Sequence, residues 1–353
     1  MAIDWTASMQ QTFEFYTVDP NTWKDVDAVT NISSCTVDRD SSQETRGSAT
    51  IDAEESMDEC YLRVYLIAIQ NDYTYRVPLG TYLIQTPGIS FDGKSQTVSI
   101  DAYTPLMELK ENLPPIGYTI FKGEAIMSLA VSLTREHLRA PVVPATDTEV
   151  LSDDFVANTS DTWLSFLSDL IENADYSYDL DELGRILFAP DQDIASMQPV
   201  WTYTDDNSSI LYPDVEDERD LYGIPNVVEV VYSTDTGYLY SKIVNDDPSS
   251  PISTVTRGRE IVYRDSNPSI SGEPTQGVLD DYATNLLKEL SCLEHTLTYK
   301  HGYCGVRVGD CVELNYERAG LSHVKAKVTA QSISCETGCP VEETAVYTTK
   351  LWR

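Results

Sequence analysis

The residue types that most often perform catalysis occur in this sequence without the spacing that catalysis requires. The four histidines, His137, His295, His301 and His323, form no HExxH motif and no other pairing on a helix. The sequence contains no Gly-x-Ser-x-Gly motif, phosphate-binding loop or dinucleotide fingerprint. With 57 Asp and Glu residues, any choice of an acid–base pair would be arbitrary. We therefore assign no catalytic residue and predict that the chain is not an enzyme.

The cysteines do not combine into the paired spacing of a structural zinc site. There are seven: Cys35, Cys60, Cys292, Cys304, Cys311, Cys335 and Cys339. The separations Cys304-x6-Cys311 and Cys335-x3-Cys339 disfavour such a site, even with a nearby histidine as a further ligand. We expect Cys335 and Cys339 to flank a β-turn that brings their thiols together across a hairpin. An odd count in a long chain argues against a disulfide framework, so free thiols in a reducing compartment are expected.

The segment Asp179–Ile186 imitates part of a calcium-binding loop. Asp179, Asp181, Gly184 and Ile186 match positions 1, 3, 6 and 8 of such a loop. Position 5 is Leu183 and position 12 is Pro190, where the loop needs an oxygen ligand and a bidentate glutamate. A β-hairpin is the better interpretation. We therefore assign no metal ligand and expect no cofactor.

The charge of the chain excludes several classes of function. The net charge is −33 at pH 7 in 353 residues, so a nucleic-acid binder and a membrane-surface protein are both disfavoured. No apolar run reaches 18 residues, and Met1–Trp5 has neither the charged nor the apolar region of a secretory signal. We expect the protein to be in the cytoplasm or in an assembly built there.

Three regions differ in their periodicity. Residues 1–108 are predicted to be nearly all β, with a break at Pro78–Gly80. Their candidate strands are Phe13–Thr17, Ile32–Val37, Gly47–Ile51, Tyr61–Gln70, Tyr73–Val77, Thr81–Gln85 and Thr97–Ala102. Such closely spaced strands favour a barrel or a sandwich.

Residues 109–225 have a mixed α+β pattern. Helices are predicted over Gly123–Leu138 and Ser160–Asn173, the second with Ser160 as its N-cap. A hairpin is predicted at Tyr176–Ala189. The acidic stretch Asp205–Asp220 is expected to be an exposed loop.

Residues 226–353 return to β structure around one helix, Thr275–Leu290. Strands are predicted at Val227–Tyr232 and Gly237–Val244. Near the C-terminus, apolar residues alternate on both sides of a predicted Gly309–Asp310 turn, which indicates a small barrel. The predicted fold is therefore mainly β with an α+β middle region. Its domains are a first β-barrel (1–108), a helix-containing domain (109–225) and a second β-barrel with a preceding helix (226–353).

Six short motifs follow one another along most of the chain. They are Pro78–Ile84, Val98–Leu106 with Leu109, Thr162-Trp163, Gly184–Ile186, Ile224–Val230 and Val306–Leu314. In this order, with three helices between them, they resemble the tail hub (baseplate hub) proteins of tailed bacteriophages. The first two resemble the first barrel of that family, the next two its middle region, and the last two its second barrel.

The resemblance implies a homotrimeric ring in the virion tail. In the family, the two barrels of each subunit are quasi-equivalent, so a trimer presents six barrels to a sixfold tail tube and still carries a threefold tip. The implied partners are the tail tube or distal tail protein, the tape-measure protein and the tip or receptor-binding proteins. The family often adds a C-terminal peptidoglycan-cleaving domain. We expect none here because the chain ends at Arg353, just after the second barrel.

The acidic charge agrees with passage of DNA through such a ring. An acidic channel would repel phosphate, so DNA would pass without stable binding. Two other functions stay open. One is a tail enzyme that degrades peptidoglycan or capsule with two carboxylates, and the other is a carbohydrate-binding tail module that uses surface Tyr or Trp.

Overall fold

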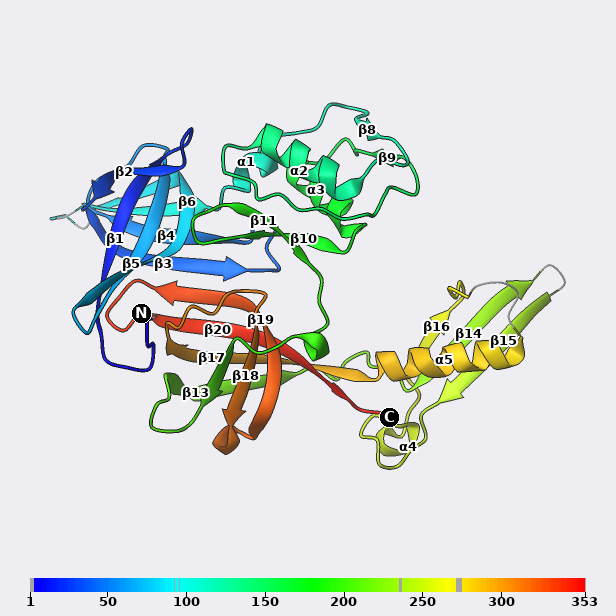
Figure 1. Ribbon diagram of the computed structural model, residues 1–353. Helices are drawn as coiled ribbons and strands as arrows, with labels where there is room; N and C mark the ends of the chain where they lie inside the picture. Colours follow the sequence, from blue (N-terminus) through cyan, green and yellow to red (C-terminus); the bar gives the residue numbers. More distant parts are fainter. Residues whose placement is uncertain (1–2, 92, 95, 235–236, 271–274, 353) are drawn as a thin grey trace. The chain divides into compact units, whose positions relative to one another are not determined.

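The computed structural model describes residues 3–91, 93–94, 96–234, 237–270 and 275–352 (Figure 1). Strands contain far more of these residues than helices do, which confirms the predicted mainly-β class. The chain divides into two compact units. Unit 1 comprises Met1–Val215 and Thr298–Ala345, and unit 2 comprises Glu216–Leu297 and Val346–Arg353. The three-domain division expected from the sequence stays a prediction.

The strands and helices have the following bounds along the described part of the chain. The strands are β1 (Gln10–Asp19), β2 (Lys24–Val29), β3 (Ile32–Asp40), β4 (Gly47–Ala53), β5 (Tyr61–Gln70), β6 (Tyr73–Phe91), β7 (Gln96–Tyr103), β8 (Thr119–Ile120), β9 (Phe155–Val156), β10 (Tyr176–Leu180), β11 (Ile186–Pro190), β12 (Trp201–Thr204), β13 (Leu211–Arg219), β14 (Val227–Thr234), β15 (Gly237–Val244), β16 (Val262–Asp265), β17 (Cys292–Gly302), β18 (Cys311–Tyr316), β19 (Leu321–Ser334) and β20 (Pro340–Lys350). The helices are α1 (Met107–Lys110), α2 (Ile126–His137), α3 (Trp163–Glu172), α4 (Thr254–Arg257) and α5 (Gln276–Leu290), with 3₁₀ turns at Ile194–Ser196 and Glu317–Ala319. None of the helices in the described ranges is both long and apolar enough to cross a lipid bilayer.

Thirteen strands form one large sheet. Its path is β13-β17-β20-β19-β3-β4-β7-β6-β5-β1-β2, with β18 and β12 branching from β19. The antiparallel pairing of β3 with β19 joins the N-terminal strands to the C-terminal ones, with Val37 opposite Ile333. Among the described residues, no pairing closes either group of strands into a ring. Closure of the two β-barrels therefore stays a prediction.

The strands β3 to β7 and the β19–β20 hairpin share one apolar core. Alternate residues of β4 and β7 are buried, as expected for strands with one face on a core. The core extends across the β3–β19 pairing, because Ile333 and Val341 belong to it together with Val37 and Ile51. Burial of these side chains stabilises the link between the two strand groups.

Strand β6 continues through Pro78, where the sequence predicted a break. Leu79 is an extra residue in β6, because Val64 pairs with Gly80 and Tyr65 with Pro78. Proline lacks an N–H group and is tolerated at a bulge or where one edge of a strand is unpaired. Both conditions hold here, since β6 pairs with β7 only from Leu83 onward.

The middle of unit 1 has its own apolar cluster under α2 and α3. Trp163, Phe166 and Leu170 of α3 are buried in it. The N-cap of α3 is Thr162, not Ser160: the Thr162 hydroxyl accepts from the N–H of Ser165, and the Ser165 hydroxyl accepts from the N–H of Thr162. The predicted hairpin is confirmed by the pairing of β10 with β11.

Two other predictions are wrong. The acidic stretch Asp205–Asp220 contains strand β13, because Leu211 and Val215 are partly covered while most of the acidic residues between and after them point to solvent. Residues 306–308 are not a strand: Gly309 has φ +92°, and the N–H of Asp310 bonds to the carbonyl of Arg307. The strand begins only at Cys311.

Unit 2 contains a three-stranded sheet with α5 on one face (Figure 1). β14 pairs antiparallel with β15 and parallel with β16. Leu279, Ala283 and Leu287 of α5 are fully buried against Val228 and Val230 of β14. The N-cap of α5 is Thr275, the first residue of the predicted helix, and its hydroxyl accepts from the N–H of Val278.

Candidate functional site

The four histidines lie in four different environments. His137 stacks on Trp163 of the apolar cluster with ring centroids 4.1 Å apart. His323 is exposed, and its Nδ1 lies 2.8 Å from an oxygen of Glu313. His295 and His301 are buried in separate polar networks. These networks are the strongest candidates for sites in the described residues.

Glu343 is the centre of a buried network in unit 1. Its Oε1 accepts hydrogen bonds from the hydroxyls of Tyr299 at 2.5 Å and Tyr203 at 3.3 Å. Its Oε2 accepts from Nε2 of Gln331 at 2.6 Å. A buried carboxylate stays charged only when such donors replace water. Glu343 is therefore held as an acceptor by donors from three other strands, β12, β17 and β19.

His301 provides the opposite charge. Its Nδ1 lies 2.8 Å from the carbonyl of Gly302, and its Nε2 lies 3.3 Å from Glu343 and 3.0 Å from the hydroxyl of Tyr203. Burial alone would lower the pKa of His301. Its contacts with Cys304 and Glu343 outweigh burial and raise this pKa to about 10. His301 is thus an imidazolium at neutral pH, paired with the Glu343 carboxylate.

The two tyrosines remain protonated donors. Burial, and then the negative charge of Glu343, raise the pKa of Tyr203 and of Tyr299 well above the ordinary value. The two rings contact edge to face with centroids 5.3 Å apart. Tyr203 comes from β12, and Tyr299 and His301 from β17, so the network holds side chains of strands that are not direct neighbours.

The network continues from Gln331 to the N-terminal strands and to the β10–β11 hairpin. Oε1 of Gln331 accepts from Nη1 of Arg39 at 3.2 Å, and Nη2 of Arg39 donates to the carbonyl of Leu79 at 2.7 Å. Glu182 lies 3.6 Å from Arg39 and 2.8 Å from Arg307. One polar chain therefore links β3, β6, β19 and the hairpin within unit 1.

The accessibility of this network decides what it can do. Glu343 is 0% exposed, and His301, Tyr203 and Tyr299 are each 1% exposed. A substrate cannot reach the carboxylate or the imidazole in this arrangement. The network instead fixes the positions of strands, which is a structural role.

The calcium-like segment forms the expected hairpin. Asp181 accepts from the backbone N–H groups of Leu183 and Arg185 and binds the Arg185 side chain. The other carboxylates, Asp179 and Glu182, face the guanidinium of Arg307. Across the part of the chain that the structure describes, no three His, Cys, Asp or Glu side chains gather as metal ligands.

A second network, in unit 2, aligns an acid, a histidine and a hydroxyl. Nδ1 of His295 lies 2.9 Å from Asp217, and its Nε2 lies 3.0 Å from the hydroxyl of Thr349. The order is that of a general base between an orienting acid and a nucleophile. However, Asp217 is also bound to Arg219 at 2.7 Å, and His295 is 5% exposed and stacked on Tyr347.

The backbone around Thr349 offers little for acyl transfer. Asp217, His295 and Thr349 lie on β13, β17 and β20, which are neighbours in the sheet. β20 lies between β17 and β19, so its backbone N–H groups are directed at neighbouring strands. An oxyanion hole needs free N–H groups beside the nucleophile. The arrangement is therefore a cross-strand polar ladder.

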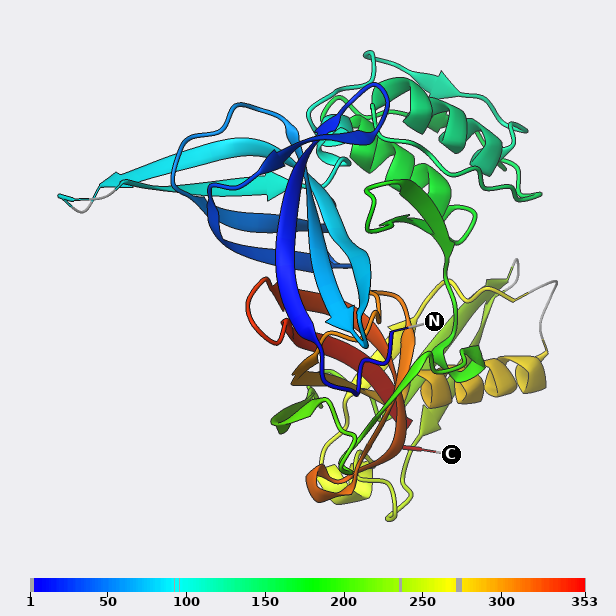
Figure 2. The same ribbon diagram turned by 60° about the vertical axis from the view of Figure 1, so that its left-hand side comes forward.

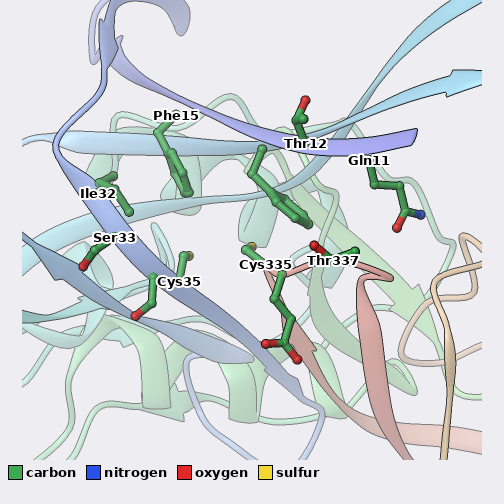
Figure 3. Close-up of a pocket in the computed structure, with 11 residues that line it drawn as sticks. Gln11, Thr12, Phe15, Ile32, Ser33, Cys35, Cys335 and Thr337 are labelled. Carbon is green, nitrogen blue, oxygen red and sulfur yellow. The ribbon is translucent and has the colours of Figure 1, made fainter. Parts of the chain in front are cut away.

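A groove in unit 1 contains two of the cysteines (Figure 3). It has a volume of about 360 Å³. Its lining residues are Gln11, Thr12, Phe13, Phe15, Ile32, Ser33, Ser34, Cys35, Cys335, Glu336 and Thr337. The N–H of Cys335 bonds to the carbonyl of Cys35 at 2.9 Å, so the two residues face each other across the β3–β19 ladder.

The surroundings of Cys335 disfavour its thiolate. A hydrogen bond with the Cys35 thiol, and then burial, raise the pKa of Cys335. Nucleophilic attack and metal ligation both need a thiolate. The predicted turn between Cys335 and Cys339 is confirmed by the bond from the N–H of Cys339 to the carbonyl of Glu336. All seven cysteines are free thiols.

The fold resembles two solved tail proteins, one of them from a prophage. A tail protein from Neisseria meningitidis MC58 matches with a TM-score of 0.63 over 96% of this chain and 97% of its own, at 13% sequence identity. The 43 kDa tail protein of prophage MuSo2 from Shewanella oneidensis matches with a TM-score of 0.60 over 95% of this chain and 98% of its own, at 10% identity. No family model and no curated protein match the sequence. The resemblance to phage tail proteins is therefore confirmed as a likeness of fold.

Sequence reasoning missed the Glu343 network, although one signal was present. Val341, Glu343 and Ala345 lie on the same face of β20, and all three are buried. An acidic residue at a core position of an alternating strand requires buried partners. The partners themselves come from three other strands and cannot be read from local spacing.

Proposed function

We propose that the chain is a structural protein of the phage virion tail, a homotrimeric hub that closes the distal end of the tail tube. The hub adapts a sixfold tube to a threefold tip during attachment and DNA ejection. The observation that carries this proposal is the likeness of fold to two tail proteins over nearly the whole length of each chain. Because the likeness is one of fold, the role itself is tested below.

The β3–β19 pairing and the Glu343 network support a ring role. A trimer can present six similar β regions only if the two regions of each subunit keep a fixed relation to each other. In unit 1, three features connect the N-terminal strands to the C-terminal strands. They are the β3–β19 ladder, the shared core and the hydrogen bonds through Gln331 and Arg39. In this proposal, residues 1–108 and 226–353 supply the two ring domains, and residues 109–225 form a separate domain.

The partners and the charge follow from the same proposal. The hub would contact the tail tube or distal tail protein, the tape-measure protein and the tip or receptor-binding proteins, after assembly in the host cytoplasm. The net charge of −33 would repel DNA phosphates during ejection. A map of the assembled ring with a neutral or basic channel would contradict this role of the charge.

We also propose that the protein has no enzymatic activity. The Glu343 network is closed to substrate, and the Asp217–His295–Thr349 ladder lacks free backbone donors. The test is hydrolysis of a nitrophenyl ester and of peptidoglycan by wild-type protein and by the variants His295→Asn and Thr349→Val. Turnover that either variant abolishes would favour the alternative of a tail enzyme.

The mass in solution tests the hub proposal most directly. One chain has a mass of 39.4 kDa, and light scattering should give about three times this value. Class averages of the particle should show a ring of nearly sixfold appearance. A monomer at micromolar concentration, or an assembly without threefold symmetry, would overturn the proposal.

A further inference from the structure

Strands β6 and β7 continue beyond the strands that flank them. β6 leaves β5 after Leu83 but stays paired with β7 as far as Phe91. β7 pairs with β4 only from Val98 onward. Ser90–Phe91 and Gln96–Thr97 therefore form a two-stranded tip beyond β4, and Gly88 and Ile89 before it lie on an edge of β6 that β5 no longer covers. Gly88–Phe91 and Gln96–Ser99 are here called the arm, which is visible at the outer end of β6 and β7 in Figure 2.

The arm exposes an apolar stripe that continues the core face. Ile89 pairs directly with Val98, and residues directly opposite each other in a ladder share one face. Val98 is buried in the core, whereas Ile89 is 65% exposed and Phe91, two residues further on the same face, is 68% exposed. A two-stranded hairpin gains its stability from packing against something else. We therefore expect another surface to cover this apolar stripe.

The groove described above lies at the same end of these strands as the arm. Ile32 of β3 pairs with Ala53 of β4, Ala53 with Val98 of β7, and Val98 with Ile89. Ile32 lines the groove, and Phe13 and Phe15 form part of its wall. An uncovered apolar projection and a partly apolar groove therefore occur at one rim, on different strands.

The charge of the chain favours a second copy as the occupant. Two copies that each carry −33 repel each other, so they can dock only where charges are few. Residues 77–100 contain only Asp92 and Lys94 as charged residues, and the groove lining contains only Glu336. Lys94 of the arm segment and Glu336 of the groove also have opposite signs. A different, oppositely charged partner would not need a contact so poor in charge.

We propose that the arm of one copy docks in the groove of the next copy, with Ile89 and Phe91 against Phe13, Phe15 and Ile32. This inference rests on the proposed homotrimer and names a surface that closes it. The contact is heterologous, because arm and groove are different surfaces, and such contacts produce rings when the rotation closes. Three copies would then have three identical arm–groove contacts.

Charged substitutions on the arm test the contact. Phe91→Asp and Ile89→Asp should each weaken association at least roughly 30-fold, as loss of a central apolar anchor does, and should shift the light-scattering mass toward the monomer. The matched control is Ile116→Asp, because Ile116 is 91% exposed and lies outside the arm and the groove. Circular dichroism checks that each variant is folded. Equal dissociation by Ile116→Asp would overturn the inference.

Cross-linking tests the register of the contact. In a background with Cys60→Ser and Cys292→Ser, the double variant Phe91→Cys/Thr337→Cys is treated with a short bismaleimide. Each thiol adds across a maleimide double bond, so that an S–C bond forms and the proton moves to the adjacent carbon. Chains of doubled and tripled mass should appear for the double variant and not for either single variant.

The outcomes separate this inference from the proposed function. A trimer that neither cross-links nor responds to Phe91→Asp overturns the arm–groove contact and leaves the trimeric hub intact. A monomeric wild-type protein overturns both. If Phe91→Asp leaves the trimer intact but releases the tail tube protein, the groove occupant is not a second copy and the inference is wrong.

Discussion

Arg39 and Glu343 bind opposite ends of one amide side chain. Arg39 donates to Oε1 of Gln331 at 3.2 Å, and Nε2 of Gln331 donates to Glu343 at 2.6 Å. The amide transmits no charge, but its planar geometry fixes the distance between a guanidinium on β3 and a carboxylate on β20. The two strand groups of unit 1 therefore share a hydrogen-bonded connection as well as a core.

Replacing the buried carboxylate should destabilise the protein strongly. Glu343→Gln leaves the imidazolium of His301 without its counter-charge, and breaking one partner of a buried pair costs about 3–5 kcal/mol of unfolding free energy. Urea unfolding measures the change. The control is Glu342→Gln, because Glu342 is half exposed and binds Lys300. That pair should contribute at most about 1 kcal/mol. Equal effects of the two variants would contradict the buried pair.

Removing both members of the pair should cost less than removing one. In His301→Leu/Glu343→Leu, neither an unpaired charge nor its desolvation penalty remains, and apolar replacements of buried pairs are often neutral or stabilising. We expect the double variant to be more stable than Glu343→Gln, as measured by its urea midpoint. If the loss of stability in the double variant equals the sum of the losses in His301→Leu and Glu343→Leu, the two residues do not interact.

Stability should fall as the pH rises above neutrality. The pKa of His301 is raised from 6.5 to about 10 in the folded protein, so its contribution is fully present below pH 6.5 and is lost as the pH approaches 10. The raised pKa of Cys335 acts in the same direction, but only above the ordinary value of 9.0. The interval from pH 6.5 to 9 therefore reports mainly on His301. Denaturation at several pH values should give a flatter profile for His301→Leu/Glu343→Leu.

The capping residue of α3 can be identified by a matched pair of substitutions. Thr162→Ala removes the hydroxyl that accepts from Ser165 and should cost about 0.5–2 kcal/mol. Ser160→Ala, at the cap position that the sequence favoured, should change the unfolding free energy by less than about 0.5 kcal/mol. Thermal denaturation of the two variants measures this difference in stability. A larger effect at Ser160 would place the helix start two residues earlier.

Local patterns predicted the elements whose stability is local. β5 spans the predicted range Tyr61–Gln70, and α5 fills the predicted range Thr275–Leu290 apart from Thr275, which is its N-cap. The predictions failed where a strand distant in sequence determines the local structure. Pro78 stays within β6 because β5 accommodates an extra residue there, and β13 forms within an acidic stretch because the large sheet continues through β17.

The candidate sites could be predicted less well than the fold. Histidine spacing gave no indication that His301 pairs with Glu343 or that His295 contacts Asp217 and Thr349. These pairs form across strands whose order in the sheet differs from their order in the chain. Only the register of the assembled sheet brings their side chains together.

The pairing of β3 with β19 also constrains synthesis of the protein. Strand β3 leaves the ribosome while nearly all of the chain that follows it, including β19, has still to be made. Until then its edge is unpaired, and the core around Val37 lacks Ile333 and Val341. Contacts between segments so far apart in sequence form slowly. Until the last strands emerge, this edge of β3 is therefore open to pairing with other chains.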